Sequence, residues 1–359
     1  MLIKRLTVTL LLGLAMLLTS EAAPGPTNGP VPSSAALPAL GPGETDLRTH
    51  DPSTIVKRGD TYWVFGTGPG IPSYSSTDRV RWTFRGPVLA QAPAWVKDAV
   101  PRNTNGFFWA PDVRLVRGTY YLYYSVSSFG SNVSAIGLAT SKTLEPGSWQ
   151  EQGIVIRSPA PENFNAIDPA IIQSPDGRLW MSFGSFWSGI KMIELHPATG
   201  KRLHPNSPIY ALAAHPQERN NAIEAPFIHF HDGYYYLFVN WDYCCRRERS
   251  TYNIRVGRSK RITGPYLNKD GVDLLKGGGT LLLSSKHDDG SGAPFDPKVG
   301  PGHAGILSEN GVDRFSFHWE YDRAREGRSV LEIRTVQWDR DGWPRIVPST
   351  TTSPVTETE

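Results

Sequence analysis

The sequence predicts an all-β fold, a five-bladed β-propeller, on the strength of three observations. A segment that combines an acidic residue near a proline, a glycine-containing turn and an aromatic-rich run recurs at a spacing of about 60 residues. The 359 residues include 35 glycines, 30 prolines and 11% aromatic residues, a composition typical of many short strands joined by turns. Segments with the apolar period of a helix are nearly absent, which argues against an α/β barrel.

The first residues are expected to be a secretory signal peptide rather than part of the fold. Lys4 and Arg5 precede an apolar run over residues 6–18, and small residues follow it. The run is short for a membrane span of about 20 residues, so a membrane anchor is the less favoured alternative. We therefore expect residues 1–23 to be removed and the protein to be secreted and extracellular, with no membrane association afterwards.

Composition predicts the remaining boundaries. A Pro/Gly/Ala-rich stretch without a periodic apolar face predicts a linker over residues 24–45. The polar segment 348–359 predicts a disordered tail. Residues 46–347 remain for the propeller, and this length is sufficient to bury a sizeable core.

Charge and cysteine content exclude several classes of protein. The net charge of +3 is too small to indicate a nucleic-acid partner, and two cysteines cannot form a disulfide-stapled scaffold. EF-hand, HExxH, P-loop, GxSxG and GxGxxG motifs are absent from the sequence. We expect a protein without a nucleic-acid partner, and a monomer.

The repeat has four clear copies and a weaker fifth. The clear copies start at His50, Trp109, Ala166 and Ala222, and their turn glycines are Gly59, Gly118, Gly177 and Gly233. Glycine supplies the positive φ of a tight hairpin, and the runs after the turns alternate or are broadly apolar, as buried strands do. The weaker copy starts at Gly300. A β-sandwich or jelly roll with accidental similarity is the alternative, which the repeated register disfavours.

Three acidic residues at matching repeat positions are the strongest candidates for chemistry. Asp51, Asp168 and Glu224 stand at the start of the first strand of their copies, and innermost strands line the channel of a propeller. One such acid alone would more often be a turn or capping residue, but three converge by symmetry. Clustered carboxylates keep one group protonated while another stays ionised, which suits glycosidic bond hydrolysis in an aromatic cleft. A Ca²⁺ or Mg²⁺ site is the rival chemistry.

The ordered motifs also carry a family resemblance. They are His50-Asp51-Pro52-Ser53, Trp109-Ala110-Pro111-Asp112, Asn165-Ala166-Ile167-Asp168-Pro169, Ile223-Glu224-Ala225-Pro226 and Gly300-Pro301-Gly302-His303. Each is weak alone, but the ordered set, together with the adjacent cysteines and STYNI, is specific. Over about residues 46–347 the chain resembles glycoside hydrolase family 43, and within it the endo-1,5-α-L-arabinanases.

The resemblance implies an inverting hydrolase that needs no cofactor for its chemistry. By the family pattern, Asp51 is the general base that activates water and Glu224 is the general acid that protonates the leaving oxygen. Asp168 orients the acid and tunes its pKa. Inversion requires the base and acid carboxyls to lie roughly 6.5–9.5 Å apart. Asp112 has no catalytic role in the family, so we interpret it as a structural residue beneath Trp109.

The resemblance also implies residues that hold substrate and metal. Trp109, Asn165 and Ser185 match positions that line the sugar subsites, and Phe129 is a further stacking surface. The structural alternatives are a blade-core tryptophan at 109 and a strand-end hydroxyl at 185. Similar arabinanases hold an ion, usually calcium, near the equivalent of His303, although Ca²⁺ prefers oxygen ligands. A structural Ca²⁺ near His303 is the expectation, and a satisfied structural histidine is the alternative.

Cys244 and Cys245 are adjacent, so an ordinary loop-closing disulfide between them is impossible. An exported protein could oxidise them to a vicinal ring instead, and the pair also resembles the arabinanase pattern. The residues that follow, 246–249, depart from that pattern because a glycine is usual there. The shape of this loop therefore stays open.

The sequence thus predicts a secreted enzyme that cuts internal α-1,5-L-arabinofuranosidic bonds, with the neutral polysaccharide arabinan of plant pectin as its partner. An exo-acting α-L-arabinofuranosidase or β-xylosidase of the same fold is one alternative. A non-catalytic carbohydrate-binding propeller is another, and the presence of all three carboxylates argues against it.

Overall fold

A computed structural model describes residues 40–287 and 295–348. The predicted signal peptide, residues 24–39 of the predicted linker and residues 349–359 of the predicted tail lie outside these residues. Within them, no helix is long and apolar enough to cross a membrane.

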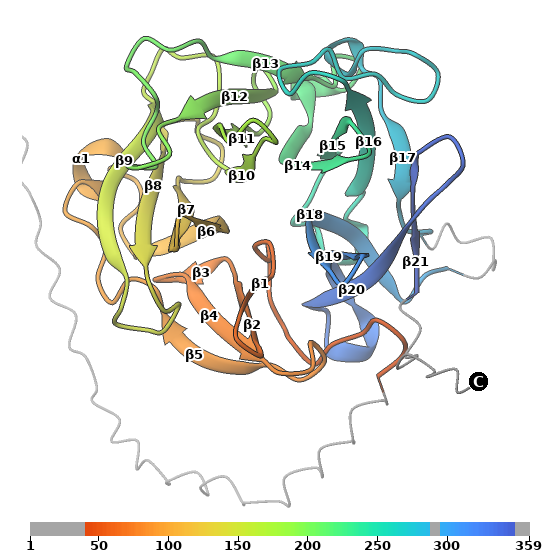
Figure 1. The fold of residues 1–359 in the computed structure, drawn as a ribbon, viewed down its shortest axis with the longest axis horizontal. Helices are drawn as coiled ribbons and strands as arrows, with labels where there is room; N and C mark the ends of the chain where they lie inside the picture. The colour runs from red at the N-terminus through yellow and green to blue at the C-terminus, as the bar shows by residue number, and fades with distance from the viewer. Residues whose placement is uncertain (1–39, 288–294, 349–359) are drawn as a thin grey trace, which may run out of the picture. The chain divides into compact units, whose positions relative to one another are not determined.

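Five antiparallel sheets form the five blades of a propeller around a central axis (Figure 1). Blade 1 contains β1 (Val56–Arg58), β2 (Thr61–Phe65), β4 (Pro72–Ser76) and β5 (Thr83–Pro87). Blade 2 contains β3 (Gly68–Pro69), β6 (Phe107–Val116), β7 (Thr119–Val126), β8 (Ser134–Ser141) and β9 (Gln150–Ser158). Blade 3 contains β10 (Ala170–Gln173), β11 (Leu179–Phe183), β12 (Ile190–Leu195) and β13 (Tyr210–Ala213).

Blade 4 contains β14 (Ile223–His231), β15 (Tyr234–Trp241), β16 (Asn253–Ser259) and β17 (Thr280–Leu283). Blade 5 contains β18 (Lys298–Glu309), β19 (Val312–Asp322), β20 (Arg328–Trp338) and β21 (Pro344–Val347). The helices of the described residues are short: α1 (Val96–Ala99), η1 (Arg219–Asn221), η2 (Arg247–Arg249), η3 (Leu274–Lys276) and η4 (Arg323–Arg325). The predicted all-β, five-bladed propeller is confirmed.

The core lies between the blades, and the second strand of each blade contributes buried side chains to it. An aromatic side chain of every second strand is fully buried, namely Phe65, Tyr123, Phe183, Phe238 and Phe317. Each such burial contributes about 1.5–3 kcal/mol relative to exposure. The turn glycines that precede these strands adopt positive φ, as the repeat predicts. The aromatic runs of the sequence are therefore chiefly blade core.

The ring is closed by the segment just before blade 1, which pairs with the last blade. The Ile333 amide donates to the Gly43 carbonyl at 2.8 Å, and the Leu331 amide donates to the Leu47 carbonyl at 3.0 Å. Glu44 forms a β-bridge with Glu332, and Thr45 is buried. Residues 43–45, expected in the linker, thus belong to the fold, because their backbone groups complete the edge of β20.

Candidate active site

A cavity of about 1050 Å³ opens at one end of the propeller, where the first strands of the blades begin. Every site residue that the sequence predicts lines it, namely Asp51, Trp109, Phe129, Asn165, Asp168, Ser185, Glu224 and His303. Further lining residues come from the loops after β11 and β15, among them Phe186, Trp187, Tyr243 and Tyr252. The propeller symmetry therefore brings the predicted residues to one place.

Each blade reaches this end of the propeller through a residue in left-handed backbone conformation. The φ angles are 46° at Asp51, 42° at Ala110, 57° at Asp168, 50° at Ala225 and 60° at His303. Such a conformation costs non-glycine residues on the order of 1–3 kcal/mol. In blades 2, 4 and 5 the strand register shifts at the same place, as in a β-bulge, which re-aims a side chain. The backbone is thus bent where the side chains must enter the cavity.

Asp51 lies in a surrounding that keeps its carboxylate ionised. Its Oδ2 accepts a hydrogen bond from the Thr67 hydroxyl at 2.6 Å and lies 2.8 Å from His50 Nδ1. Its own amide donates to His318 Nδ1 at 2.8 Å, so that imidazole carries its proton on the other nitrogen. Burial alone would raise the pKa of Asp51, but the charge and hydrogen bond of His50 lower it well below the usual range.

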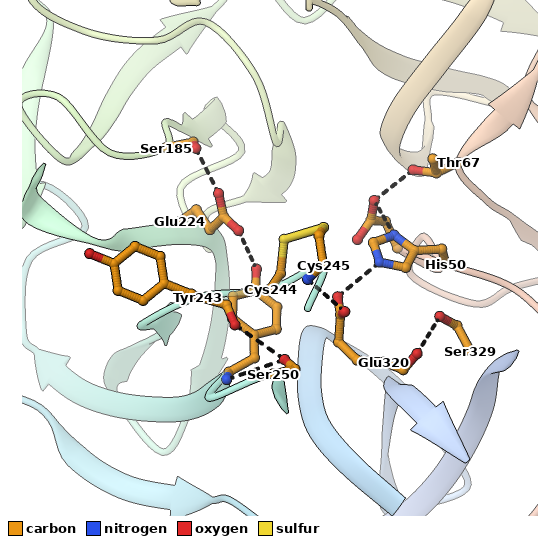
Figure 2. The surroundings of a disulfide bond; sticks show 12 residues. His50, Thr67, Ser185, Glu224, Tyr243, Cys244, Cys245, Ser250, Glu320 and Ser329 are labelled. Carbon is orange, nitrogen blue, oxygen red and sulfur yellow. Dashed lines mark hydrogen bonds and ion pairs between the residues drawn. A yellow bond between two sulfur atoms is a disulfide. The ribbon is translucent and has the colours of Figure 1, made fainter. Parts of the chain in front are cut away.

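A second carboxylate, that of Glu320 on blade 5, contacts the other ring nitrogen of His50. His50 Nε2 lies 2.9 Å from Glu320 Oε1, and the Cys245 amide donates to Glu320 Oε2 at 2.7 Å (Figure 2). Burial alone would lower the pKa of His50, but Asp51 and Glu320 raise it well above its usual value. Burial would likewise raise the pKa of Glu320, but the neighbouring imidazoles of His318 and His50 lower it to about 2. His50 is therefore an imidazolium held between two carboxylates.

Glu224 is buried in a surrounding that favours its protonated form. Burial raises the pKa of its carboxyl, and the charge of Asp51 adds to this. Hydroxyls of Ser185 and Tyr252 donate to its two oxygens at 2.7 and 2.9 Å and offset part of the rise. Figure 2 shows Ser185 on one side of Glu224 and a tyrosine ring on the other. The pKa of Glu224 is therefore raised while the carboxyl is held in one orientation.

Asp168 lies against the backbone that follows Glu224. Its Oδ2 accepts a hydrogen bond from the Ala225 amide at 3.1 Å, and its own amide donates to the Ser125 hydroxyl at 2.9 Å. Burial and the charges of Glu224 and Asp51 raise the pKa of Asp168 well above its usual value. Because two buried carboxyls in proximity cannot both ionise cheaply, the charge of Glu224 disfavours ionisation of Asp168.

Aromatic side chains from blades 2, 3 and 4 line the same cavity as the acids. On blade 2, the rings of Trp109 and Phe129 meet edge to face at 5.7 Å, and Phe129 is 75% exposed. From blades 3 and 4, Phe186 and Tyr243 contact each other at 6.0 Å, and Trp187 is also exposed. Trp109 thus lines the cavity rather than the blade core.

The other predicted polar residues have clear positions. Asn165 is buried in the cavity wall, where its Oδ1 accepts a hydrogen bond from the Ser134 hydroxyl at 2.7 Å. Asp112 lies outside the cavity lining and accepts the amides of Thr54 and Ile171 at 3.0 and 2.8 Å. It joins blade 2 to both neighbouring blades, which confirms its structural interpretation.

His303 is buried at the cavity wall, and Asp51 is the carboxylate beside it. Burial lowers the pKa of His303 to about 4, so the imidazole is neutral, and its Nδ1 lies 3.6 Å from Asp51 Oδ1. Ca²⁺ takes six to eight oxygen ligands. Of the Asp51 oxygens, Oδ2 engages His50 and Thr67, and Oδ1 faces His303.

Cys244 and Cys245 form a vicinal disulfide in the cavity wall. The Cys245 amide that donates to Glu320 is part of this ring (Figure 2). The adjacent Arg246, in the segment that departs from the family pattern, places its guanidinium 4.0 Å from the centre of the Tyr243 ring.

The sequence analysis assigned no role to three residues that contact the acids, His50, Thr67 and Tyr252, or to Glu320, which contacts His50. His50 and Tyr252 stand inside the motifs that carry the family resemblance, and His50 directly precedes Asp51 in the sequence. Glu320 lies in the apolar run FSFHWEY, and a carboxylate within a buried strand was the available signal.

Comparison with known proteins decides the family. Residues 45–344 match the family described as "Glycosyl hydrolases family 43". The chain belongs to glycosyl hydrolase family 43. This membership makes it a glycoside hydrolase, as the sequence predicts.

Similar proteins of known name include both endo- and exo-acting enzymes. The chain is 42% identical over 320 residues to an extracellular exo-α-(1→5)-L-arabinofuranosidase of Cellvibrio japonicus, covering 86% of this family 43 chain and 89% of that protein. It is 42% identical over 316 residues to extracellular endo-α-(1→5)-L-arabinanase 1 of Bacillus subtilis, with 87% and 92% covered. A solved family 43 endo-arabinanase from Bacillus licheniformis matches with a TM-score of 0.77 at 43% identity, covering 85% of this chain and 100% of that one.

Proposed function

We propose that this family 43 hydrolase cleaves internal α-1,5-L-arabinofuranosidic bonds of arabinan with inversion of configuration. The observation that carries the proposal is that the pKa values of Asp51 and Glu224 are shifted in opposite directions within one cavity. Two carboxyls with separated pKa values can act as base and acid at the same pH.

Asp51 is the general base. Its carboxylate stays ionised because His50 and Thr67 bind the oxygen Oδ2, and Oδ1 is left to accept the proton of a water. That water attacks the anomeric carbon of the arabinofuranosyl unit from the face opposite the leaving group. The bond to the leaving oxygen breaks, and the carbon inverts.

Glu224 is the general acid, and Asp168 is the residue that supports it. Glu224 gives its proton to the leaving oxygen as the bond breaks and regains one from solvent before the next turnover. Asp168 fixes the backbone next to Glu224 through the Ala225 amide. The protonation state that is competent for hydrolysis therefore has Asp51 ionised and Glu224 protonated.

Internal cleavage is supported by aromatic surfaces on both sides of the acids. Blade 2 supplies Trp109 and Phe129, whereas the loops of blades 3 and 4 supply Trp187 and Tyr243. Blade 2 and blade 4 are not neighbours in the ring (Figure 1), so a polysaccharide can contact both while a bond between them is cut. Exo-acting arabinofuranosidase activity is the second candidate, because a relative of similar identity carries that name.

The proposal extends to the place where the enzyme works. Two relatives are named extracellular, which agrees with the signal peptide expected over residues 1–23, so we propose secretion. Monomeric state and calcium near His303 stay predictions.

Product analysis on linear α-1,5-arabinan tests the proposal. Internal cleavage releases a ladder of oligosaccharides early, whereas exo action releases one short product from the start. Proton NMR of the first product distinguishes inversion from retention, and an initial product with retained configuration would refute the assignment of Asp51 as a base that activates water.

A further inference from the structure

Two histidines and an aspartate form a cluster at the junction of blades 4 and 5, apart from the catalytic cavity. His229 and His231 lie near the end of β14, and Asp313 lies near the start of β19. None of the three lines the cavity described above. Glu224 stands at the opposite end of β14, five to seven residues away, which corresponds to roughly 17–23 Å along a strand.

Strand geometry explains why the two histidines converge. Residues i and i+2 of a strand face the same side, so His229 and His231 point together while Phe230 points away. His229 Nε2 lies 3.4 Å and His231 Nδ1 lies 3.7 Å from the same oxygen, Asp313 Oδ2. One donor atom from each of the three residues lies within 4.8 Å of the others.

These separations fit a shared metal ion better than direct ion pairs. Charge-assisted hydrogen bonds between imidazole and carboxylate have lengths of about 2.7–2.9 Å, which both separations exceed. In a tetrahedral site with metal–ligand bonds of about 2.0–2.2 Å, neighbouring donor atoms lie about 3.4 Å apart. The two nitrogen–oxygen separations are therefore close to the edge of such a site.

The surroundings hold the three ligands in place. The Trp338 indole donates to Asp313 Oδ2 at 3.0 Å, and the Ser308 hydroxyl donates to Oδ1 at 2.5 Å. The His231 ring stacks on Trp338 with 3.8 Å between ring centres and 7° between planes. Outer contacts of this kind orient metal ligands and fix their geometry. The side chains of His229, His231 and Asp313 are 14%, 33% and 13% exposed, so an ion from solvent can reach them.

We propose that His229, His231 and Asp313 bind a divalent transition-metal ion, Zn²⁺ in the first place, which clips the inner strand of blade 4 to blade 5. Two imidazole nitrogens and one carboxylate suit Zn²⁺, Ni²⁺ or Cu²⁺, whereas Ca²⁺ and Mg²⁺ prefer oxygen ligands. Three protein ligands leave one position for water. The role is structural, because the ion joins two blades at a distance from the catalytic acids.

Titration of the chelator-treated full chain with Zn²⁺ tests the proposal by calorimetry and thermal melting. The wild type should bind one Zn²⁺ at this cluster, and the melting temperature should rise by roughly 5 °C or more once Zn²⁺ exceeds its Kd a hundredfold. His231→Gln and Asp313→Asn should each weaken this binding about 10–100-fold. Circular dichroism checks that the variants fold, and His229→Gln replaces any that does not.

Two control variants separate this cluster from other histidines. His204→Gln changes an exposed histidine of a distant loop, and His303→Gln changes the histidine of the catalytic cavity. Both should retain the Zn²⁺ site. Absence of binding by the wild type, unchanged affinity in His231→Gln and Asp313→Asn, or loss of the site in His303→Gln alone would each overturn the proposal.

Discussion

The hydroxyl of Tyr252 offers a direct test of how the pKa of the proposed general acid is set. It donates to Glu224 Oε1 at 2.9 Å in a fully buried position, and the pKa of Tyr252 is itself raised well above its usual value by burial. A hydrogen bond to a charged group contributes about 1.5–3 kcal/mol. Because one pKa unit corresponds to about 1.36 kcal/mol, Tyr252→Phe should raise the pKa of Glu224 by about one unit or more.

The direction follows from which form of the acid the bond stabilises. The phenol donates a proton, so it favours ionised Glu224, and its removal favours the protonated acid. The general acid then stays protonated to higher pH, and the alkaline limb of the kcat/KM profile should move upward. This limb reports an apparent pKa of the Asp168–Glu224 pair in the free enzyme.

The assay is the pH dependence of kcat/KM on an arabinan oligosaccharide, with Tyr243→Phe as the matched control. Tyr243 lines the same cavity, but its hydroxyl donates to Glu218 and to the Arg219 carbonyl, each at 3.0 Å, rather than to a catalytic carboxylate. Tyr243→Phe should leave the alkaline limb of the kcat/KM profile unchanged. An unchanged or lowered limb in Tyr252→Phe, or an equal shift in Tyr243→Phe, would refute the reasoning.

Three further predictions concern other parts of the site and fold. Asp51→Asn and Glu224→Gln should each lower kcat by about 10²–10⁴-fold with an unchanged circular dichroism spectrum, and near-wild-type turnover by either would contradict its role. Asp112→Ala should reduce the free energy of unfolding by about 2–4 kcal/mol in urea titration, because two buried amides lose their acceptor. Phe129→Ala should raise KM for arabinan with little change in kcat, since its exposed ring lies on the cavity wall; a lowered kcat at constant KM would argue against a binding role.

The fold was predictable because each blade repeats the same local code. A turn glycine, an aromatic strand and an acid at the blade start each determine structure within one blade. The repetition of the blade then arranges these features around one axis. The closure of the ring was not predictable in the same way. Residues 43–47 pair with β20 through backbone groups up to 290 positions apart, as the Ile333 amide bonded to the Gly43 carbonyl illustrates. Their composition is that of a linker, so no side-chain pattern marks the pairing.

The convergence of the three acids was predictable from the repeat, whereas Trp109, Asn165, Ser185 and His303 were predictable only from the family motifs. Asp51, Asp168 and Glu224 share a position in the repeat, so convergence on one cavity followed from the fold. The partners that separate their pKa values do not repeat: His50, Tyr252 and Glu320 occur once each. Their contacts depend on how neighbouring blades meet, which is a property of packing between sheets and not of any one strand.

The closed ring also determines the stage of folding at which the active site forms. Asp51 and His50 precede blade 1, yet His318 and Glu320, which fix their charges, belong to the last blade to leave the ribosome. Contacts of such high sequence separation form slowly. A nascent or partly folded chain therefore carries all three proposed catalytic acids without the electrostatic setting of the base. Recovery of hydrolysis during refolding should lag behind the return of β-structure and coincide with docking of blade 5 on the N-terminal segment.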